Sequence, residues 1–297
     1  MKLEELLGKL KAMPLTVGLA EQIEILQARY ETEYEDVAEG ILCLFEALGL
    51  DAVKTGRKYI YDYLKQMDYF IENKSYGHLD FDVIRGEIYD NEKVMMETYM
   101  PGLLLSYAYT TILYEKNHLF LTDFLTRLKE NMVGIEVGFG EGFYLWEIFR
   151  YFPRIKIRGY DISPYAIQFA TQILKVEGIE EGRYILKYGN VFEGLPQADE
   201  TVDFGVLAEV IEHIPDPEIG IEEIVRILKR GGLLYLTTVI DSNHMDHISN
   251  FESPEIVEKM LEERGLKIIA KKIYHMQDDF PQTMDISVGL AYIAEKL

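Results

Sequence analysis

The sequence predicts an α/β protein in which a doubly wound sheet of seven strands follows an all-helical N-terminal region. Three observations support this fold class. From residue 132 onward, short apolar runs alternate with amphipathic helical patterns, as in a parallel sheet covered on both faces. Before about residue 130, apolar residues recur at helical spacing and no alternating strand pattern occurs. A glycine turn then joins the first apolar run to a helical pattern, which is typical of the ligand-binding edge of such a sheet.

Residues 1–130 are predicted to form a helical domain, and residues 131–297 the sheet domain. Helices are expected at residues 3–10, at 23–27 as a short helix, at 37–48 ending at Gly49, and at 59–70. The uncharged run 98–114 is shorter than the roughly 20 residues that cross a membrane, so we expect a buried helix. Residues 73–90 are expected to form a looser connection and a candidate lid.

Tyrosine is dense in the helical region, and two interpretations stay open. The rings can fill the core while each hydroxyl reaches the surface, as amphipathic side chains do. Alternatively, some of the tyrosines line a pocket above a ligand bound at the sheet. The residues concerned are Tyr59, Tyr61, Tyr63, Tyr69, Tyr76, Tyr89, Tyr99, Tyr107, Tyr109 and Tyr114.

The sheet domain is predicted to alternate strands with helices and to end in two further strands. Strands are expected at 132–138, 155–161, 183–189, 202–208, 232–239, 265–269 and 285–293, and helices near 142–152, 164–177, 217–229 and 253–264. Ser163 before Pro164 is a favourable helix N-cap. Ligands bind such sheets at the carboxyl ends of the strands, so one pocket can collect the polar residues there. These are Glu136, Asp161, Asn190 and Glu209.

The glycine turn, Gly138-Phe139-Gly140-Glu141-Gly142, is the strongest local signal of a ligand site. Glycine lets a ligand approach the backbone closely, and the following helix N-terminus offers free N–H groups. About twenty residues later, Asp161 ends the second strand, where an acid can accept hydrogen bonds from both hydroxyls of a ribose. Enzymes that use NAD and enzymes that use S-adenosyl-L-methionine (SAM) share these features, so the two features do not separate the classes.

The sequences of the motifs resemble those of class I SAM-dependent methyltransferases over roughly residues 130–297. The turn reads Glu136-x-Gly138-x-Gly140 rather than G-x-G-x-x-G, which disfavours an NAD-linked oxidoreductase. Residues 189–191, 203–217 and 228–234 are similar to later motifs of the family. The resemblance implies a Rossmann-like methyltransferase sheet ending in an antiparallel hairpin, with SAM as cofactor. It also implies that the N-terminal helices cap the site or form a homodimer.

The resemblance also assigns cofactor contacts along the carboxyl edge of the sheet. Glu136 would accept a hydrogen bond from the ammonium group of SAM, Asp161 would bind the ribose, and Asn190 the adenine. The glycines would let the cofactor approach the backbone. The full implied set is Glu136, Gly138, Gly140, Asp161, Ile162, Asn190, Val191 and Glu209.

Ionisable residues gather after the fourth predicted strand, where Glu209, Glu212 and His213 spell Glu-x-x-Glu-His. His247 follows in the loop after the fifth strand. The motif is similar to one that binds a divalent ion in ubiquinone-pathway O-methyltransferases and small-RNA 2′-O-methyltransferases. Three roles stay open: a general base, a structural role, or a site for Mg²⁺, Mn²⁺, Fe²⁺ or Zn²⁺. The catalytic candidates are His213, His247 and Glu212, and the metal candidates are Glu209, Glu212, His213 and His247.

Charge narrows the substrate class. The chain has 51 acidic and 30 basic residues, a net charge of −21, which repels nucleic acid and anionic membrane surfaces. We therefore expect a methyltransferase of small-molecule biosynthesis that acts at an oxygen atom. Metal-dependent C-methylation of a 2-oxo acid is an alternative, as is a non-catalytic binding protein on the same fold. The sequence does not reveal the acceptor.

The one cysteine, Cys43, lies in an apolar helical run and is expected to be buried. A single cysteine allows no intrachain disulfide, which fits a reducing cytosol. The first residues lack the apolar core of a signal peptide. We therefore expect a cytoplasmic protein.

Overall fold

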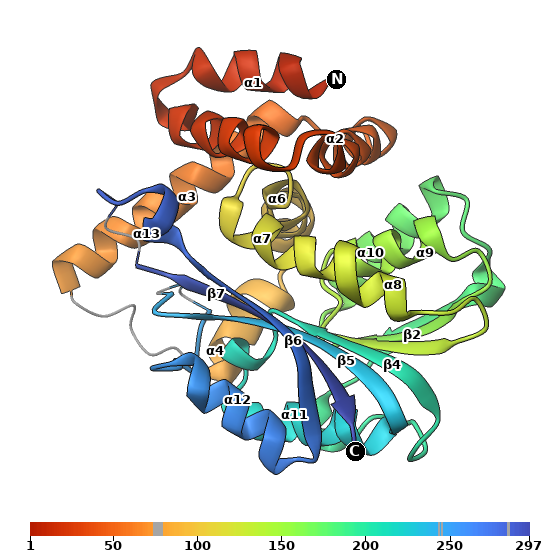
Figure 1. Ribbon diagram of the computed structural model, residues 1–297. Helices are drawn as coiled ribbons and strands as arrows, with labels where there is room; N and C mark the ends of the chain where they lie inside the picture. Colours follow the sequence, from red (N-terminus) through yellow and green to blue (C-terminus); the bar gives the residue numbers. More distant parts are fainter. Residues whose placement is uncertain (74–79, 243, 245, 284–285) are drawn as a thin grey trace.

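The computed structural model describes residues 1–73, 80–242, 244, 246–283 and 286–297, including the side chains of all these residues except 67–73. Helices α1, α2, α6 and α7 of the N-terminal region are stacked over one face of a seven-stranded sheet (Figure 1). Further helices cover both faces of the sheet, with α9 and α10 on one side and α11 and α12 on the other. The predicted fold class is therefore confirmed.

The strand order of the sheet is β3-β2-β1-β4-β5-β7-β6. β1 pairs in parallel with β2 and β4, while β2 pairs with β3 and β4 with β5 in the same way. β7 runs antiparallel to both β5 and β6, which is the hairpin that the family resemblance implied. The strands are β1 Val133–Val137, β2 Lys156–Asp161, β3 Tyr184–Tyr188, β4 Val202–Ala208, β5 Leu228–Ile240, β6 Leu266–His275 and β7 Val288–Lys296.

Helices make up the described N-terminal residues before β1, as predicted. The N-terminal helices are α1 Leu3–Lys11, α2 Val17–Ala47, α3 Ala52–Asn73, α4 Phe81–Ile84, α5 Glu92–Val94, α6 Met100–Ser106, α7 Thr111–Leu119 and α8 Leu125–Arg127, with short 3₁₀ or π segments η1 Pro14–Thr16, η2 Arg85–Tyr89, η3 Met95–Tyr99 and η4 Phe120–Phe124. The later helices are α9 Phe143–Tyr151, α10 Pro164–Val176, α11 Pro217–Ile227, α12 Pro254–Glu263 and α13 Met276–Asp279, with η5 Glu181–Arg183, η6 Val191–Glu193 and η7 Ile211–His213.

Buried apolar side chains form two clusters, one on each face of the sheet. The first joins α1, α2, α6 and α7 to α9, α10 and the sheet residues Phe204 and Tyr235. The second packs α11 and α12 against the opposite face, for example through Ile224 and Leu236. Because the first cluster extends across residue 130, the helical region and the sheet share a hydrophobic core. The division into two domains at that residue stays a prediction.

The helical region differs from its prediction in where the helices break. The predicted short helix at 23–27 belongs to α2, which bends at Glu31, where φ is 47° and ψ is −125°. Gly49 ends the following stripe as predicted, with a φ of +69°. The prediction of one helix over 98–114 is wrong, although most of this run is buried. Pro101 lies in the first turn of α6, and the extended backbone of Thr110 separates α6 from α7.

The predicted loose connection at 73–90 is only partly described, because residues 74–79 lie outside the described residues. Its second half is helical rather than loose. α4 begins after Asp80, whose side chain accepts a hydrogen bond from the backbone N–H of Asp82. η2 follows directly and ends at Tyr89. The predictions for Tyr69 and Tyr76 concern side chains outside the described residues.

The expectation that Cys43 is buried is wrong, because its side chain is exposed. The apolar stripe of α2 is formed by Ile41, Leu44 and Phe45, all of which are buried. Residues two positions apart on a helix face different directions, so Cys43 lies on the solvent side of the same helix.

Strand ends in the last third of the chain also differ from the prediction. β5 begins at Leu228, so Gly231, with a φ of +73°, lies inside a distorted strand rather than before it. β6 continues to His275, beyond the predicted end at 269. β7 begins at Val288, and the predicted start at 285 lies outside the described residues.

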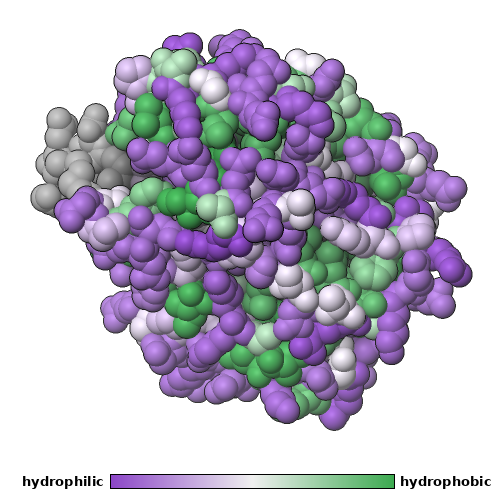
Figure 2. Space-filling model, turned by 45° about the horizontal axis from the view of Figure 1, so that its top comes forward, coloured by the Kyte–Doolittle hydropathy of each residue, from purple (hydrophilic) through white to green (hydrophobic). Residues whose placement is uncertain are grey.

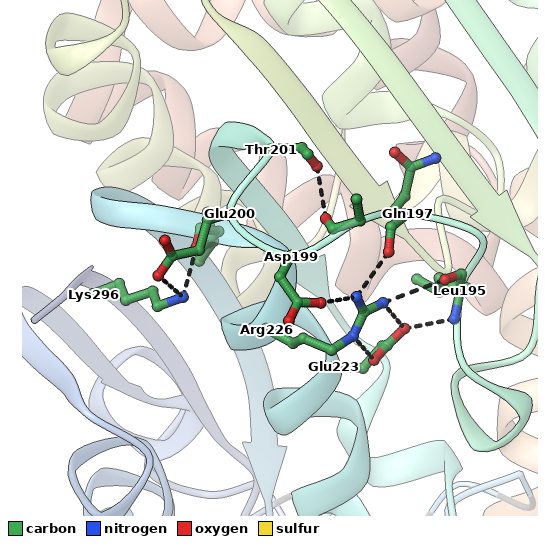
Figure 3. A network of polar contacts seen from close by, with 10 residues as sticks. Leu195, Gln197, Asp199, Glu200, Thr201, Glu223, Arg226 and Lys296 are labelled. Carbon is green, nitrogen blue, oxygen red and sulfur yellow. Dashed lines mark hydrogen bonds and ion pairs between the residues drawn. The ribbon is translucent and has the colours of Figure 1, made fainter.

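Arg226 of α11 forms hydrogen bonds with the loop before β4, at residues 195–199 (Figure 3). Its guanidinium forms two hydrogen bonds with the Glu223 carboxylate, of 2.8 and 2.7 Å. It also donates to the backbone oxygen of Gln197 at 2.7 Å and to Asp199 at 2.6 Å. Glu223 in turn accepts from the backbone N–H of Leu195 at 2.5 Å. This network fixes the loop before β4 and so supports the strand that carries part of the candidate site.

The outer surface is largely polar. Figure 2 shows hydrophilic side chains over most of one face, with hydrophobic ones in small groups between them. In the parts of the chain that the structure describes, no helix is long and apolar enough to cross a membrane.

Candidate active site

A cavity of 1370 Å³ lies between the N-terminal helices and the carboxyl edge of the sheet. Its floor is formed by residues that end β1, β2 and β4 or follow them. Its roof comes from α2, α3, η2, η3, α6 and α7, and one side from residues 276–283 after β6. All eight residues predicted to bind the cofactor line this cavity, namely Glu136, Gly138, Gly140, Asp161, Ile162, Asn190, Val191 and Glu209.

The glycine turn has the backbone that only glycine adopts easily. Gly138, Gly140 and Gly142 have φ values of +65°, +50° and +84°. A Cβ atom on Gly138 would lie 2.5 Å from Val210, so this glycine allows the turn to pack against the segment after β4. A Cβ on Gly140 would meet nothing within 4 Å in the described part of the chain, and Gly140 lines the cavity. The turn therefore leaves room for a ligand against its backbone.

Asp161 ends β2 and holds the glycine turn in place. One carboxylate oxygen accepts from the Gly140 N–H at 2.9 Å and the other from the Ser163 N–H at 2.8 Å. Ser163, as predicted, is the side chain that caps α10. Burial raises the pKa of Asp161 to about 6, although these N–H groups favour the charged form. Its oxygens keep further lone pairs for hydroxyl donors in the cavity.

Glu136 and Glu141 are two buried acids beside the turn. Glu136 is 3% exposed, and its Oε2 has no hydrogen-bond partner among the described residues. Burial raises its pKa well above the usual value, and the nearby Glu141 and Asp161 add to the rise. Burial likewise raises the pKa of Glu141 to about 7. Such carboxyls favour a cationic ligand, because a cation would stabilise the charged form. Sequence reasoning missed Glu141, although its place between two glycines was the available signal.

Asn190 follows β3 and caps the short segment η6. Its Oδ1 accepts from the Phe192 N–H at 3.0 Å, and its Nδ2 donates to Glu193 at 3.3 Å. The side chain is therefore held at the cavity wall by the backbone after it. Val191 lies beside it and is buried.

Glu209, at the end of β4, has an unusual backbone and an unexpected partner. Its φ of +53° is rare for a residue with a side chain. Its Oε1 accepts from Thr237 Oγ1 at 2.6 Å, and its Oε2 lies 2.6 Å from Nζ of Lys116. Lys116 comes from α7 and is only 1% exposed. Glu209 therefore forms an ion pair with the helical region, and its place among the metal ligands stays a prediction.

His213 lines the cavity and is oriented by Asp246. Its Nδ1 lies 3.0 Å from the backbone oxygen of Asp246 and 3.6 Å from its carboxylate. Both of these groups accept, so Nδ1 carries the proton and Nε2 of a neutral ring is left as the base. Burial opposes the charged imidazolium, but Asp246 and Glu212 outweigh it and raise the pKa of His213. Tyr99 of η3 donates to the Asp246 carboxylate at 2.5 Å.

His247 and Glu212 complete the cluster. Nδ1 of His247 donates to the backbone oxygen of Ser242 at 2.7 Å, and burial together with the neighbouring histidines lowers its pKa to about 3. Glu212 is buried behind the cavity wall, where Oε2 accepts from Thr238 at 2.8 Å and Oε1 has no partner among the described residues. One ligand atom from each of Glu212, His213 and His247 lies within 4.8 Å of the others. The residue types and the free Glu212 oxygen fit a divalent ion.

The roof of the cavity settles the question left open for the tyrosines. Tyr59, Tyr63, Tyr89, Tyr99 and Tyr107 line the cavity, so the pocket interpretation holds for these residues. The expectation that every hydroxyl reaches the surface is wrong, because the hydroxyls of Tyr109 and Tyr114 are buried. Sequence reasoning missed Lys116, Tyr99 as the partner of Asp246, and residues 276–283 as one side of the cavity. These contacts join segments that are far apart in the chain.

The fold and the site together are those of a SAM-dependent methyltransferase domain. A family model described as a methyltransferase domain matches residues 128–284, and the chain belongs to this family.

Curated relatives are similar over part of their length. The chain is 33% identical over 106 residues to 2-methyl-6-phytyl-1,4-hydroquinone methyltransferase 1 of Oryza sativa, which is 34% of this chain and 29% of that protein. It is 26% identical over 126 residues to the ubiquinone biosynthesis O-methyltransferase of Rhizobium rhizogenes, covering 35% and 51% of the two chains. The chain thus spans about a third to a half of these relatives.

Solved structures share the fold at low identity. A geranyl diphosphate methyltransferase in complex with GPP and sinefungin superposes with a TM-score of 0.53 and 15% identity, covering 67% of this chain and 82% of that one. The [4+2]-cyclase SpnF gives a TM-score of 0.51 and 18% identity, covering 59% and 79%. Because the second protein is described as a cyclase, likeness of fold does not determine the reaction.

Proposed function

We propose that the protein transfers the methyl group of SAM to a hydroxyl oxygen of a small, uncharged and largely apolar molecule. The observation that carries this proposal is the Asp246–His213 pair at the cavity wall. A hydroxyl must lose a proton as it attacks the methyl carbon. His213 has Nδ1 held by Asp246 and so offers Nε2 for that proton.

Apart from this base, methyl transfer requires few catalytic groups from the protein. The sulfonium is already an activated donor, so the site must align the acceptor with the methyl group and exclude water. SAM would lie along the sheet edge, with its ribose at Asp161 and its adenine at Asn190. Glu136 and Glu141 would face its positively charged groups. The methyl group would then point toward the roof, where the acceptor binds.

The lining of the roof supports an apolar acceptor without negative charge. Apolar residues such as Ile60, Met100 and Leu103 alternate with tyrosines there. Acidic residues outnumber the lysines of the described lining, Lys65 and Lys116, and Lys116 is already paired with Glu209. This field opposes a carboxylate or phosphate, and so disfavours a 2-oxo acid. The acidic residues that line the cavity are Glu21, Asp62, Glu87, Glu136, Glu141, Asp161, Glu209, Asp246 and Asp279.

The relatives support the same substrate class. The rice and Rhizobium proteins are named for a hydroquinone with a phytyl chain and for ubiquinone biosynthesis. Both names describe rings with oxygen substituents and apolar chains. Because the chain overlaps only part of these proteins, their names support the substrate class and not a particular acceptor.

A second candidate is metal-assisted methyl transfer at the same place. The buried Oε1 of Glu212, which has no partner among the described residues, favours it, together with His213 and His247. A divalent ion held by these three residues would lower the pKa of an acceptor hydroxyl, so that no separate base is needed. The two candidates use the same residues and differ in their response to a chelator.

The test measures methyl transfer from labelled SAM to a pair of matched probes. We expect an alkyl-substituted catechol to be methylated on oxygen. A benzoate anion that carries the same alkyl substituent on its ring should be left unchanged. Preference for the benzoate, or methylation of carbon, would contradict the proposal. Treatment with EDTA separates the two candidates, because loss of turnover that Mg²⁺ or Mn²⁺ restores supports the metal and unchanged turnover supports the His213 base. Binding of the demethylated product S-adenosylhomocysteine (SAH), with no turnover of any probe, would favour the non-catalytic alternative.

A further inference from the structure

Lys116 is a buried lysine of the helical region, and its side chain lines the cavity. It lies in α7, and its side chain is 1% exposed although it lines the cavity. Its backbone is fixed by the Tyr235 hydroxyl of β5, which donates to the Lys116 carbonyl at 2.8 Å. Burying an ammonium group is costly, so such a group requires close negative partners. The partner that the structure provides is Glu209 at 2.6 Å.

The ion pair lies beside the glycine turn. β1 and β4 are neighbours in the sheet, so Gly138 and Glu209 follow adjacent strand ends. A Cβ on Gly138 would touch Val210, the residue next to Glu209. The pKa of Glu141 is raised first by burial and also by the charges of Asp161 and Glu209. Lys116 therefore lies beside the glycine turn, on the side where Glu209 follows β4.

SAM carries two positive groups and one negative group in its methionine part. The sulfonium and the ammonium have several carboxylates to face, including Glu136 and Glu141. The α-carboxylate has fewer choices, because the described lining contains no arginine and its lysines are Lys65 and Lys116. Lys65 lies on α3 with an exposed side chain, whereas Lys116 is buried near the glycine turn. An ammonium has three N–H donors, so its bond to Glu209 does not exhaust it.

We infer that Lys116 binds the α-carboxylate of SAM, so that the helical region supplies part of the cofactor site. The inference rests on the proposed function, because it takes SAM as the ligand of the cavity. In this arrangement Lys116 bridges two carboxylates, that of Glu209 and that of the cofactor. Cofactor binding then adds a contact between the sheet edge and α7, beyond the ion pair already present. A lysine that only joins α7 to β4 would not distinguish ligands by their carboxylate.

The experiment compares two ligands that differ only in the carboxylate. Binding of SAH and of its decarboxylated analogue is measured by calorimetry. The wild-type protein should prefer SAH by roughly tenfold or more, as expected for a hydrogen bond between charged groups. In Lys116→Met the ratio of the two dissociation constants should fall to nearly one, mainly because SAH binds more weakly. Lys116→Arg should keep most of the preference, and Lys65→Met, the matched control, should keep all of it.

Lys116→Met leaves Glu209 without its partner, which can destabilise the fold. The double variant Lys116→Met, Glu209→Gln removes both charges and should also show a ratio near one. An unchanged preference for SAH in both variants would overturn the inference and leave a purely structural ion pair. A wild-type protein that binds both ligands equally would overturn it as well. Failure of the wild-type protein to bind either ligand would instead reject SAM as the cofactor, and with it the proposed function.

Discussion

The sheet edge and the helical roof face each other across one cavity, and they are built in different ways. At the sheet edge, each side chain lies at the end of a strand or just after it, and tight turns such as Gly138 to Gly142 support its position. At the roof, residues from α2, α3, η3 and α7 meet through packing between segments that are far apart in the chain. We infer that the sheet edge binds most of the cofactor, while the roof, apart from Lys116, determines which acceptor can enter the cavity.

The two regions also differ in chemistry. The edge concentrates buried carboxyls whose pKa values are raised by burial, such as Glu136 and Glu141, and these suit a cationic ligand. The roof presents tyrosines and aliphatic side chains, with Tyr99 reaching across to Asp246. Variants at the edge and at Lys116 should therefore change cofactor binding, and variants at the histidines or elsewhere in the roof should change turnover.

The largest effect is expected when both histidines of the cavity are removed. His213→Ala with His247→Ala should lower kcat by roughly 10²- to 10⁴-fold, the usual contribution of a general base. SAH affinity, measured by calorimetry, should stay within about threefold of wild type, because neither ring belongs to the cofactor edge in our assignment. Full activity of the double variant would reject both the base and the metal at this place.

The variant Asp161→Ala tests whether the sheet edge binds the ribose of the cofactor. The variant should weaken SAH binding by about a hundredfold or more, because two hydroxyl hydrogen bonds to a charged acceptor are each worth roughly 1.5–3 kcal/mol. Asp199→Ala is the matched control, since Asp199 pairs with Arg226 in the network of Figure 3 and lies outside the cavity lining. Unchanged SAH affinity in Asp161→Ala would remove Asp161 from the cofactor site.

The buried carboxyls predict how stability depends on pH without cofactor. Glu141 has a pKa of about 7 in the folded protein, against 4.5 as its ordinary value. The folded state therefore holds more protons between these values, so the free energy of unfolding should fall as pH rises from about 4.5 to 7. The contribution of Glu141 is on the order of 3 kcal/mol, at about 1.4 kcal/mol per unit.

Denaturant unfolding at pH 5 and pH 8 measures this dependence. Glu141→Gln should reduce it by the contribution of this one carboxyl, because other buried acids such as Glu147 also have raised pKa values, and Glu193→Gln, at an exposed acid, should leave it as in wild type. A wild-type protein that gains stability from pH 5 to pH 8, with no difference in Glu141→Gln, would contradict the burial of this carboxyl.

The smallest effect is expected at Tyr99, where the roof meets the histidine pair. Tyr99→Phe removes one hydrogen bond to Asp246 and should lower kcat by roughly three- to tenfold, with SAH affinity unchanged. The midpoint of the pH–rate profile should also move, because the Asp246 charge that supports His213 loses a donor. Tyr61→Phe, at an exposed tyrosine, serves as control. An equal effect of the two variants would mean that the roof does not act on the base.

The sequence predicted the sheet edge well because its signals are local. A glycine that needs a positive φ, an acid that ends a strand and a serine that caps a helix are each recognised from a few neighbouring residues, as for Gly140, Asp161 and Ser163. The antiparallel hairpin that ends the sheet followed from the family resemblance.

The roof was less predictable because its contacts are tertiary. Nothing near Lys116 in the sequence indicates a partner 93 positions later, so its ion pair with Glu209 could not be predicted. Cys43 was misjudged because its prediction rested on the apolar run around it and not on the helical spacing, which places it beside the buried stripe. Apolar periodicity also could not show the break between α6 and α7.

A crystal structure of the protein with SAH tests the central claim most directly, namely that the cofactor lies along the sheet edge and its reactive end faces the roof. We predict that both ribose hydroxyls lie within about 2.6–3.2 Å of the Asp161 carboxylate. The sulfur should face the space between His213 and Tyr99, with its α-carboxylate toward Lys116. SAH bound outside the cavity, or within it with the sulfur turned away from His213 and Tyr99, would contradict the account.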